Sequence, residues 1–199
     1  PIVSVNASLN GRRAADETVG WTFPSVEVKI DQPDYTGSGE VLVRGDNVMM
    51  GYYNDPYSTA DVFTNGWFRT GDLGHLNKDG SLTITGRKKN LIILSNGENV
   101  SPEEIEYQLA RIPEIKEVVV YTEGNLIVAE IFPEENEMTD ADLKAVLQER
   151  INDYNAHQPS HKRVNKVKIR KNEFEKTTTH KIKRYKVLEK SKKEQEKES

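Results

Sequence analysis

The sequence predicts an α+β protein in two parts, a β-rich stretch followed by a small α+β unit. Three observations carry this prediction. Apolar and polar residues alternate in short runs up to residue 86, which is typical of strands. After residue 100, apolar residues recur at helical spacing. A cluster of cations, Gly86-Arg87-Lys88-Lys89, separates the two patterns, and 199 residues give room for two small domains.

Short strands joined by turns are expected in the first part. Alternation predicts strands around residues 26–30, 41–43 and 82–84. The segment Asn77-Lys78-Asp79-Gly80 is typical of a turn and precedes the last of these strands. A brief helix is expected over residues 58–63, so this part is mostly β.

The second part is predicted to begin with a strand and a helix. Residues 91–94 are all apolar, and residues 95–99 have the composition of a hairpin turn. The segment Ser101-Pro102-Glu103-Glu104 has the pattern of a capping box, with proline at the first helical position. The helix that follows has one apolar face, formed by Ile105, Leu109 and Ile112.

Two strands, a second helix and a final strand complete the predicted order. Apolar runs at residues 118–121 and 126–132 flank a Glu123-Gly124 turn. A second helix is expected to begin at Thr139, and its apolar positions are Leu143, Val146, Leu147 and Ile151. Alternation over residues 167–169 predicts the last strand, so the second part is a small α+β sandwich.

The composition excludes several classes of function. The chain contains no cysteine, which rules out disulfides, thiolate metal sites and cysteine nucleophiles and is compatible with a cytoplasmic protein. The four histidines are not spaced like the ligands of a metal centre, so no metal site is expected. No run approaches the roughly 18 consecutive apolar residues that a membrane-spanning helix requires.

Charge is distributed unevenly along the chain. Residues 161–199 hold fifteen Lys/Arg and six Asp/Glu, whereas the whole chain has a net charge of −4. A basic end can bind nucleic acid, anionic lipid or a small anionic ligand, or it can be a solvated helical face. Residues 190–199 contain no apolar side chain to bury, and we expect them to be solvated and frayed.

Two segments carry side chains suited to sugar or phosphate chemistry. Asp72 lies within Thr70-Gly71-Asp72-Leu73-Gly74 and is expected on a glycine-flanked turn. Its carboxylate can accept two hydrogen bonds from a vicinal diol, or it can simply cap the turn. Residues 177–184 group hydroxyls with cations that can offset phosphate charge, but they lack the glycine-rich loop of a P-loop.

Five segments, taken in order, resemble the adenylate-forming acyl-CoA synthetase family, whose relatives include luciferases and the adenylation domains of peptide synthetases. The matching segments are GEVLVRG at 39–45 with GYYNDP at 51–56 and TADVF at 59–63, GWFRTGDLG at 66–74, GRKKNLI at 86–92, NGENVSPEEIE at 96–106 and KTTTHKIKR at 176–184. The ending from Asn172 to Tyr185 is most similar to the long-chain fatty acid–CoA ligase branch.

The resemblance implies a fold and a place for this chain in a longer protein. Residues 1–86 would be the β-rich end of a large N-terminal domain, and residues 87–89 would be a hinge. Residues 90–187 would form a mobile C-terminal lid domain with a mixed sheet and flanking helices, and residues 188–199 a charged, disordered tail. The chain would then be a C-terminal fragment, because the family's phosphate loop lies upstream of these motifs.

The resemblance also implies a reaction in two halves. A carboxylic acid, expected here to be a fatty acid, attacks the α-phosphate of ATP and gives acyl-AMP and pyrophosphate. Coenzyme A then displaces AMP and gives acyl-CoA. Mg²⁺ would arrive with ATP and be held mostly by the missing N-terminal domain, so the fragment alone would be inactive. No nucleic-acid partner is implied, and a peripheral membrane contact is compatible with such a substrate.

Two alternatives to a fatty acid–CoA ligase are considered. One is another adenylate-forming enzyme that loads an acid onto a carrier protein. The other belongs to a different class and is a non-catalytic module that binds nucleic acid through the basic C-terminal region. Few aromatic residues are interleaved with those cations, Phe174 and Tyr185 being the examples, which disfavours the second alternative.

Five residues receive roles from the matched motifs. Lys181 would be the lid lysine of the adenylation step, lying between the carboxylate and the α-phosphate. Asp72 would bind the ribose diol, and Arg87 would add a ribose or phosphate contact. Lys89 matches the hinge position, whose dihedral angles absorb the lid rotation. Gly97 lies in the hairpin that family members turn toward the CoA pantetheine.

One position departs from the family pattern. The family usually has glycine immediately before the lid lysine, whereas this chain has His180 before Lys181. If the position requires a positive φ, histidine adopts it less readily than glycine but better than a β-branched residue. The geometry at His180 therefore bears on the role of Lys181.

Overall fold

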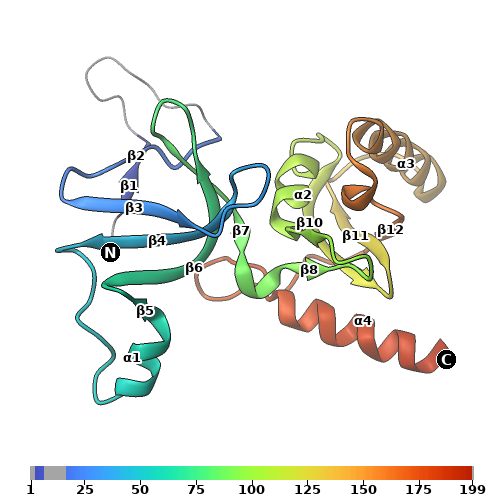
Figure 1. Cartoon of the computed structure of the whole chain (residues 1–199). Coiled ribbons are helices and arrows are strands. Elements are labelled where there is room, and N and C mark those ends of the chain that lie inside the picture. The colour runs from blue at the N-terminus through green and yellow to red at the C-terminus, as the bar shows by residue number, and fades with distance from the viewer. Residues whose placement is uncertain (1–2, 7–16, 199) are drawn as a thin grey trace. The chain divides into compact units, whose positions relative to one another are not determined.

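The chain forms two compact units in a computed structural model that describes residues 3–6 and 17–198 (Figure 1). The units are Pro1–Asn90 and Leu91–Ser199. Their boundary lies one residue beyond the segment 87–89 in which the family resemblance implies a hinge. Each unit has its own core, as expected for separate folding units.

The first unit is built on an antiparallel sheet of five strands. Its elements are β1 (Ser4–Val5), β2 (Trp21–Thr22), β3 (Val26–Asp31), β4 (Gly39–Gly45), α1 (Pro56–Val62), β5 (Phe63–Thr64), β6 (Trp67–Leu76), β7 (Leu82–Arg87) and η1 (Lys88–Asn90). The strand order is β3-β4-β6-β5, with β7 paired to β6, while β1 and β2 form a separate pair. The predicted strands, the turn and the brief helix of this part are confirmed.

One expectation in the first unit is wrong: residues 70–74 do not form a turn but lie inside the ten-residue strand β6. Leu42 of β4 is opposite Arg69, whereas Glu40 is opposite Leu73, so β6 carries extra residues at this point. Gly71 has φ +70°. Glycine here therefore marks an irregularity within a strand rather than a chain reversal, and such bulges re-aim the side chains around them.

The second unit is a small α+β sandwich. Its elements are β8 (Ile92–Ile93), β9 (Asn99–Val100), α2 (Pro102–Leu109), β10 (Ile115–Glu123), β11 (Leu126–Pro133), α3 (Asp140–Ala156), η2 (Ser160–Lys162), β12 (Lys166–Ile169) and α4 (Arg184–Glu198). Strands β10 and β11 are antiparallel and β11 and β12 are parallel, which gives the expected mixed sheet. Strands β8 and β9 form a separate hairpin.

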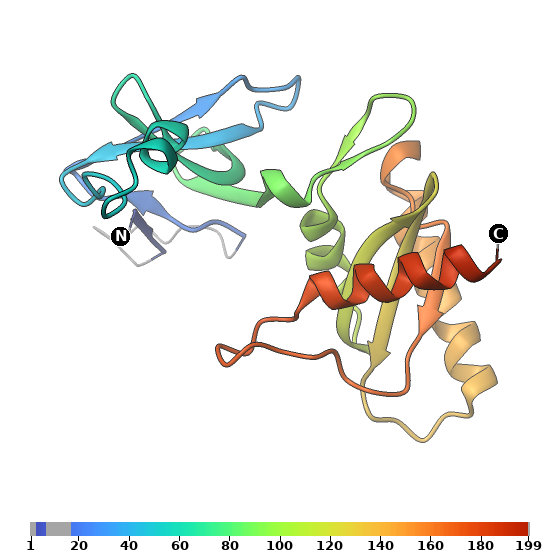
Figure 2. The ribbon, with the colours of Figure 1, turned by 90° about the horizontal axis from the view of Figure 1, so that it is seen from below.

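Helices cover both faces of the second sheet, and α4 crosses one of them (Figure 2). Val118 and Val120 of β10 pack with apolar residues of α2 and α3 on one face. Val119 and Tyr121 pack with Phe174 and with Val187 of α4 on the other. Because both faces are buried, β10 is a continuous apolar run instead of an alternating one.

The two predicted helix starts differ in how they are capped. At α3, the hydroxyl oxygen of Thr139 accepts a hydrogen bond from the backbone N–H of Asp142 at 3.2 Å. At α2, proline lies in the first turn as expected, but Ser101 makes no side-chain capping bond. Its hydroxyl lies 3.3 Å from the Glu103 carboxylate, to which it donates, so the capping-box prediction is wrong. The buried position of Ser101 accompanies this arrangement.

The charged C-terminal segment is helical, so the expectation of disorder over residues 188–199 is wrong for the described residues up to 198. Helix α4 continues to Glu198. Ser191 is buried, and its hydroxyl donates to Glu123 at 3.3 Å. Glu194 accepts from Lys168 at 3.1 Å. Residues 190–198 lack apolar side chains, and polar contacts with the sheet hold this part of the helix, whereas Val187 and Leu188 pack against the sheet before it.

The basic C-terminal region pairs with the acidic middle of the same unit. Its cations contact carboxylates of α2, β10 and β11 in the pairs Lys162–Glu104, Lys166–Glu123, Arg170–Glu130, Lys176–Glu117 and Arg184–Glu106. The uneven charge distribution is thus largely an intramolecular complementarity. An external polyanion is not needed to balance these cations.

Glu106 and Arg184 join three elements at the start of α4. The Glu106 carboxylate accepts from Arg184 and also from the backbone N–H of Val120, at 2.6 Å in the latter case. Arg184 donates to the Val120 carbonyl at 2.9 Å. Burial raises the pKa of Glu106, and the nearby guanidinium opposes that rise. Removing the cation would leave a largely buried carboxylate without its charge partner.

We therefore expect Arg184→Met to destabilise the second unit by roughly 3 kcal/mol at neutral pH. The loss should shrink as the pH falls through the raised pKa of Glu106, because the folded carboxyl is then neutral and no buried charge remains. Urea unfolding of the chain at neutral and mildly acidic pH measures both values. The exposed Lys190→Met on the same helix is the control and should change stability by less than about 0.5 kcal/mol. An equal loss of unfolding free energy at both pH values would show that the charge of Glu106 is not its cause.

Candidate functional site

Asp72 and Arg87 are brought together by the pairing of β6 with β7. They are directly opposite each other in the ladder, and Arg87 Nε lies 2.6 Å from Asp72 Oδ1. The irregularity in β6 fixes Asp72 locally, because its backbone N–H donates to the Thr70 hydroxyl at 3.0 Å. That hydroxyl in turn donates to the carbonyl of Val41 at 2.8 Å. The strand pairing thus brings Asp72 and Arg87, fifteen positions apart in the sequence, into contact.

The electrostatics of this pair suit a polar ligand. Burial raises the pKa of Asp72, and the Arg87 guanidinium acts in the opposite direction. The Asp72 side chain is 27% exposed and the Arg87 side chain 52% exposed, so both can be reached from solvent. An ionised carboxylate accepts hydrogen bonds from two hydroxyls, while a guanidinium with free N–H groups binds an oxyanion.

Lys89 lies in the short helix η1, next to the boundary between the two units. Its side chain is exposed, and within residues 3–6 and 17–198 it makes no ion pair. The residue before it, Lys88, donates to Glu40 of β4 at 2.9 Å. The sequence pattern assigns no role to Glu40 and shows Lys88 as one of the cations between the two parts. The signal for Glu40 is a carboxylate directly before the apolar residues 41–43 of β4.

Gly97 occupies the turn of the β8–β9 hairpin. Its N–H donates to the Leu94 carbonyl at 2.8 Å, and the Leu94 N–H donates to the Glu98 carbonyl at 2.9 Å. Gly97 has φ +82°, while a Cβ built there would meet nothing within 4 Å. The backbone conformation, not lack of space within the hairpin, is therefore what favours glycine at this position.

Lys181 lies in a tight turn closed by a bridge between Lys176 and Ile182. The N–H of Thr177 donates to the Lys181 carbonyl at 2.8 Å, and the N–H of His180 donates to the Thr177 carbonyl at 3.0 Å. The Thr177 hydroxyl also accepts from the Lys181 N–H at 3.2 Å. These bonds fix the backbone on both sides of Lys181 while its side chain stays exposed.

His180 has φ +59°, in the left-handed region. A turn followed by one left-handed residue is a recurrent short hairpin connection, and glycine is favoured at its last position. The departure noted in the sequence is therefore a histidine in a conformation that suits glycine. Histidine is one of the few other residues enriched there, so the strain is modest.

The charge of Lys181 is not balanced locally. Its neighbours in the same segment each pair with a carboxylate, namely Lys176, Lys183, Arg184 and Lys186. Lys181 has no such partner among the residues that the structure describes. An exposed ammonium on a fixed turn can approach an external anion without first breaking an internal ion pair.

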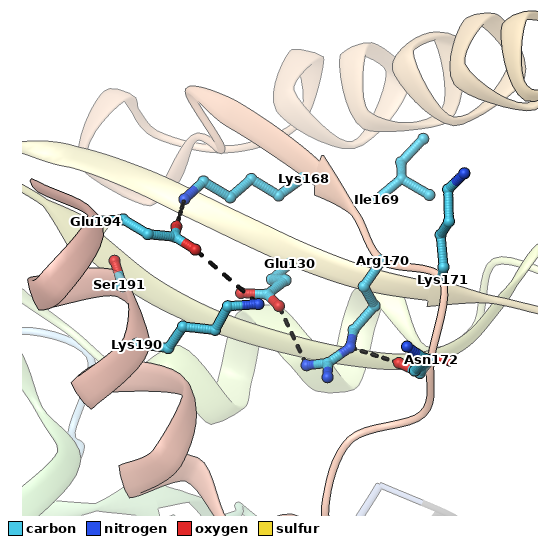
Figure 3. Close-up of a pocket in the computed structure, with 9 residues that line it drawn as sticks. All are labelled: Glu130, Lys168, Ile169, Arg170, Lys171, Asn172, Lys190, Ser191 and Glu194. Carbon is cyan, nitrogen blue, oxygen red and sulfur yellow. Dashed lines mark hydrogen bonds and ion pairs between the residues drawn. The ribbon is translucent and has the colours of Figure 1, made fainter. Parts of the chain in front are cut away.

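A separate cleft of about 430 Å³ lies between the end of β12 and α4 (Figure 3). None of the five predicted site residues lines it. Its inner cations are already matched, because Arg170 pairs with Glu130 at 3.1 Å and Lys168 with Glu194 at 3.1 Å. The guanidinium of Arg170 also lies 3.9 Å from the ring centroid of Phe174. The polar contacts along this cleft thus hold α4 against the sheet.

The described part of the chain contains no group of three or more His, Cys, Asp or Glu residues arranged to hold a metal ion. None of its helices is long and apolar enough to cross a bilayer.

Known proteins match both the sequence and the fold. The family model for the AMP-binding enzyme C-terminal domain matches residues 89–197. The indoleacetate–CoA ligase of Aromatoleum aromaticum is 48% identical over 109 residues, which are 52% of this chain and 21% of that protein. The long-chain-fatty-acid–CoA ligase FadD15 of Mycobacterium tuberculosis is 46% identical over 103 residues, which are 52% of this chain and 16% of that protein.

The fold is similar to that of solved adenylate-forming enzymes. The o-succinylbenzoate–CoA synthetase of Bacillus subtilis, in complex with an acyl-adenylate intermediate, superposes with a TM-score of 0.69 at 27% identity. The match covers 86% of this chain and 35% of that one. This chain therefore spans about a third of that structure and a smaller share of the two ligases. It belongs to the adenylate-forming, AMP-binding enzyme family and carries the C-terminal domain of that family.

Proposed function

We propose that this chain is the C-terminal part of an ATP-dependent acyl-CoA ligase. In the first half-reaction, a carboxylate oxygen bonds to the α-phosphorus of ATP and pyrophosphate leaves. In the second, the sulfur of CoA bonds to the acyl carbon and AMP leaves. The observation that carries this proposal is Lys181, an exposed and locally unbalanced cation on a fixed turn of a domain whose matched relatives are named as CoA ligases.

In this proposal Lys181 acts in the first half-reaction. Two anions, the carboxylate and the α-phosphate, must approach each other, and a preorganised ammonium between them lowers that repulsion. The hydrogen bonds of the turn hold the Lys181 backbone, so less ordering is needed when the anions bind.

Asp72 and Arg87 are proposed to hold the nucleotide. Two ribose hydroxyls donate to the Asp72 carboxylate, and the Arg87 guanidinium keeps that carboxylate ionised although burial raises its pKa. The N–H groups that Arg87 does not use on Asp72 are available to a phosphate or a ribose oxygen. Mg²⁺ would enter with ATP as part of the substrate, and we propose that the residues that hold it lie outside this chain.

The second half-reaction is proposed to use Lys89 and Gly97. Rotation about the backbone of Lys89 would turn the face of the second unit that carries Lys181 away from the substrates. The face that carries the Gly97 hairpin would then be turned toward them. The open space around Gly97 leaves room for a thin ligand arm beside the backbone. On this proposal the chain is inactive without the large N-terminal domain.

We propose a fatty acid as the acid. Long-chain-fatty-acid–CoA ligases of Mycobacterium tuberculosis and Schizosaccharomyces pombe and a fatty acyl-CoA synthetase of Dictyostelium discoideum are among the relatives. The indoleacetate–CoA ligase argues against a fatty acid, since it is named for an aromatic acid. A cytoplasmic location with peripheral membrane contact fits a fatty acid.

A screen of acids by pyrophosphate release, using the full-length ligase, tests whether the substrate is a fatty acid. Preference for an aromatic acid would overturn this proposal.

Lys181→Ala in the full-length ligase should slow acyl-AMP formation by about 100-fold or more, because one preorganised charge is lost from the transition state. Thioester formation from supplied acyl-AMP should change little. Pyrophosphate release measures the first step and acyl-CoA formation the second. Lys192→Ala, an exposed lysine on α4, is the control and should retain both. Adenylation at the unchanged rate would remove Lys181 from the mechanism.

The turn before Lys181 yields a stability prediction on this chain. His180→Val should lower the free energy of unfolding by about 1–2 kcal/mol, because a β-branched residue is poorly compatible with φ +59°. His180→Gly should be neutral or stabilising by up to about 1 kcal/mol, because glycine adopts this conformation without strain. Urea unfolding ranks the three proteins. A valine variant as stable as the histidine protein would show that the left-handed geometry is not maintained.

A further inference from the structure

A chain of charges connects the first unit's sheet to the residue before the hinge position. Lys88 Nζ lies 2.9 Å from Glu40 Oε2. The same carboxylate oxygen accepts from Arg69 of β6, and Arg69 Nη1 lies 3.8 Å from Asp31 of β3. Three strands therefore fix the position of the Glu40 carboxylate, which Lys88 then contacts from outside the sheet.

The two ends of the Lys88–Glu40 pair differ in exposure. The Glu40 side chain is 7% exposed, whereas that of Lys88 is 55% exposed. Burial alone would raise the pKa of Glu40, but hydrogen bonds from Lys88 and Arg69 lower it below the usual range. The carboxylate is thus a fixed, charged anchor. An exposed ion pair contributes little to overall stability, but here one partner is already immobilised, so the pair mainly restrains Lys88.

The restraint ends at the hinge position. Arg87 is held by the β6–β7 ladder and by Asp72. Lys88 is held by Glu40, and Lys89 has no ion-pair partner among residues 3–6 and 17–198. Within the short helix η1, Lys89 is therefore the first residue after the sheet whose side chain no ion pair of the described chain restrains, so a backbone rotation there breaks no ion pair of its own.

We propose that Lys88 is a positioning residue: its ion pair with Glu40 confines the hinge motion to Lys89 and keeps Arg87 beside Asp72. This proposal rests on the proposed function for its catalytic consequence but not for its structural one. Lys88 touches neither substrate nor reacting atoms in this assignment. Glu40 keeps Arg69 when Lys88 is replaced, so the substitution leaves no orphaned buried charge.

Hydrogen exchange on this chain tests the structural part. Lys88→Met should speed exchange of the backbone amides of residues 86–90 about threefold to tenfold, with an unchanged melting temperature, because the anchor adds local rather than global stability. Lys88→Arg should restore slow exchange, since its guanidinium can still reach Glu40. Lys78→Met, an exposed lysine of the 77–80 turn, is the matched control. Equal exchange in the Lys88→Met and unsubstituted chains would overturn the proposal.

Kinetics in the full-length ligase test the catalytic part. Lys88→Met should raise KM for ATP about threefold to tenfold, because Arg87 is held less firmly beside Asp72, and Lys88→Arg should restore it. Faster exchange with an unchanged KM would overturn the positioning role in catalysis. A full-length protein without any ligase activity would refute the proposed function, and the exchange result alone would then decide whether Lys88 is anchored by Glu40.

Discussion

Charge complementarity between the basic C-terminal region and the acidic middle of the second unit is the constraint on which that unit depends. The pair of Glu106 and Arg184 is its most enclosed part and ties α2, β10 and α4 together through Val120. Buried pairs of this kind add little net stability compared with apolar packing, but they are costly to break and so fix one arrangement. Arg184 lies three residues after Lys181, so this pair anchors the chain directly after the turn that presents that lysine.

The elements with strong local patterns could be predicted from the sequence. Strands β3, β4, β10 and β11 follow from alternation or apolar runs, and the buried residues Leu143, Leu147 and Ile151 follow from helical spacing. The family resemblance raised a positive φ before Lys181 as a condition, and the backbone of His180 has φ +59°. For the strands and the helix, the physical cause lies within a few residues of the signal, which is why a local pattern is enough.

The expectations that were wrong depended on distant partners. The last residues of α4 are polar throughout, and their helix is held by Ser191 against Glu123, sixty-eight positions away. Gly71 is typical of a turn, but the pairing of β6 with β4 makes it an irregularity within a strand. The Lys88–Glu40 contact spans forty-eight positions and has no local signature. A short stretch of sequence reflects the secondary-structure propensity of its own residues, whereas these features come from the pairing of distant strands and charges.

The distribution of ion pairs gives a physical reason for singling out Lys181 from a region rich in cations. A cation used to hold the fold is matched by a carboxylate placed by another element, as at Lys176, and losing that match costs stability. A cation used on a ligand has to remain unmatched until the ligand arrives, and its backbone has to be fixed so that little ordering is left to be done. Within residues 176–186 of the described chain, Lys181 meets both conditions. The fold thus separates the cations that hold it together from the one proposed to act on a ligand by where it supplies carboxylates, and composition alone could not make that separation.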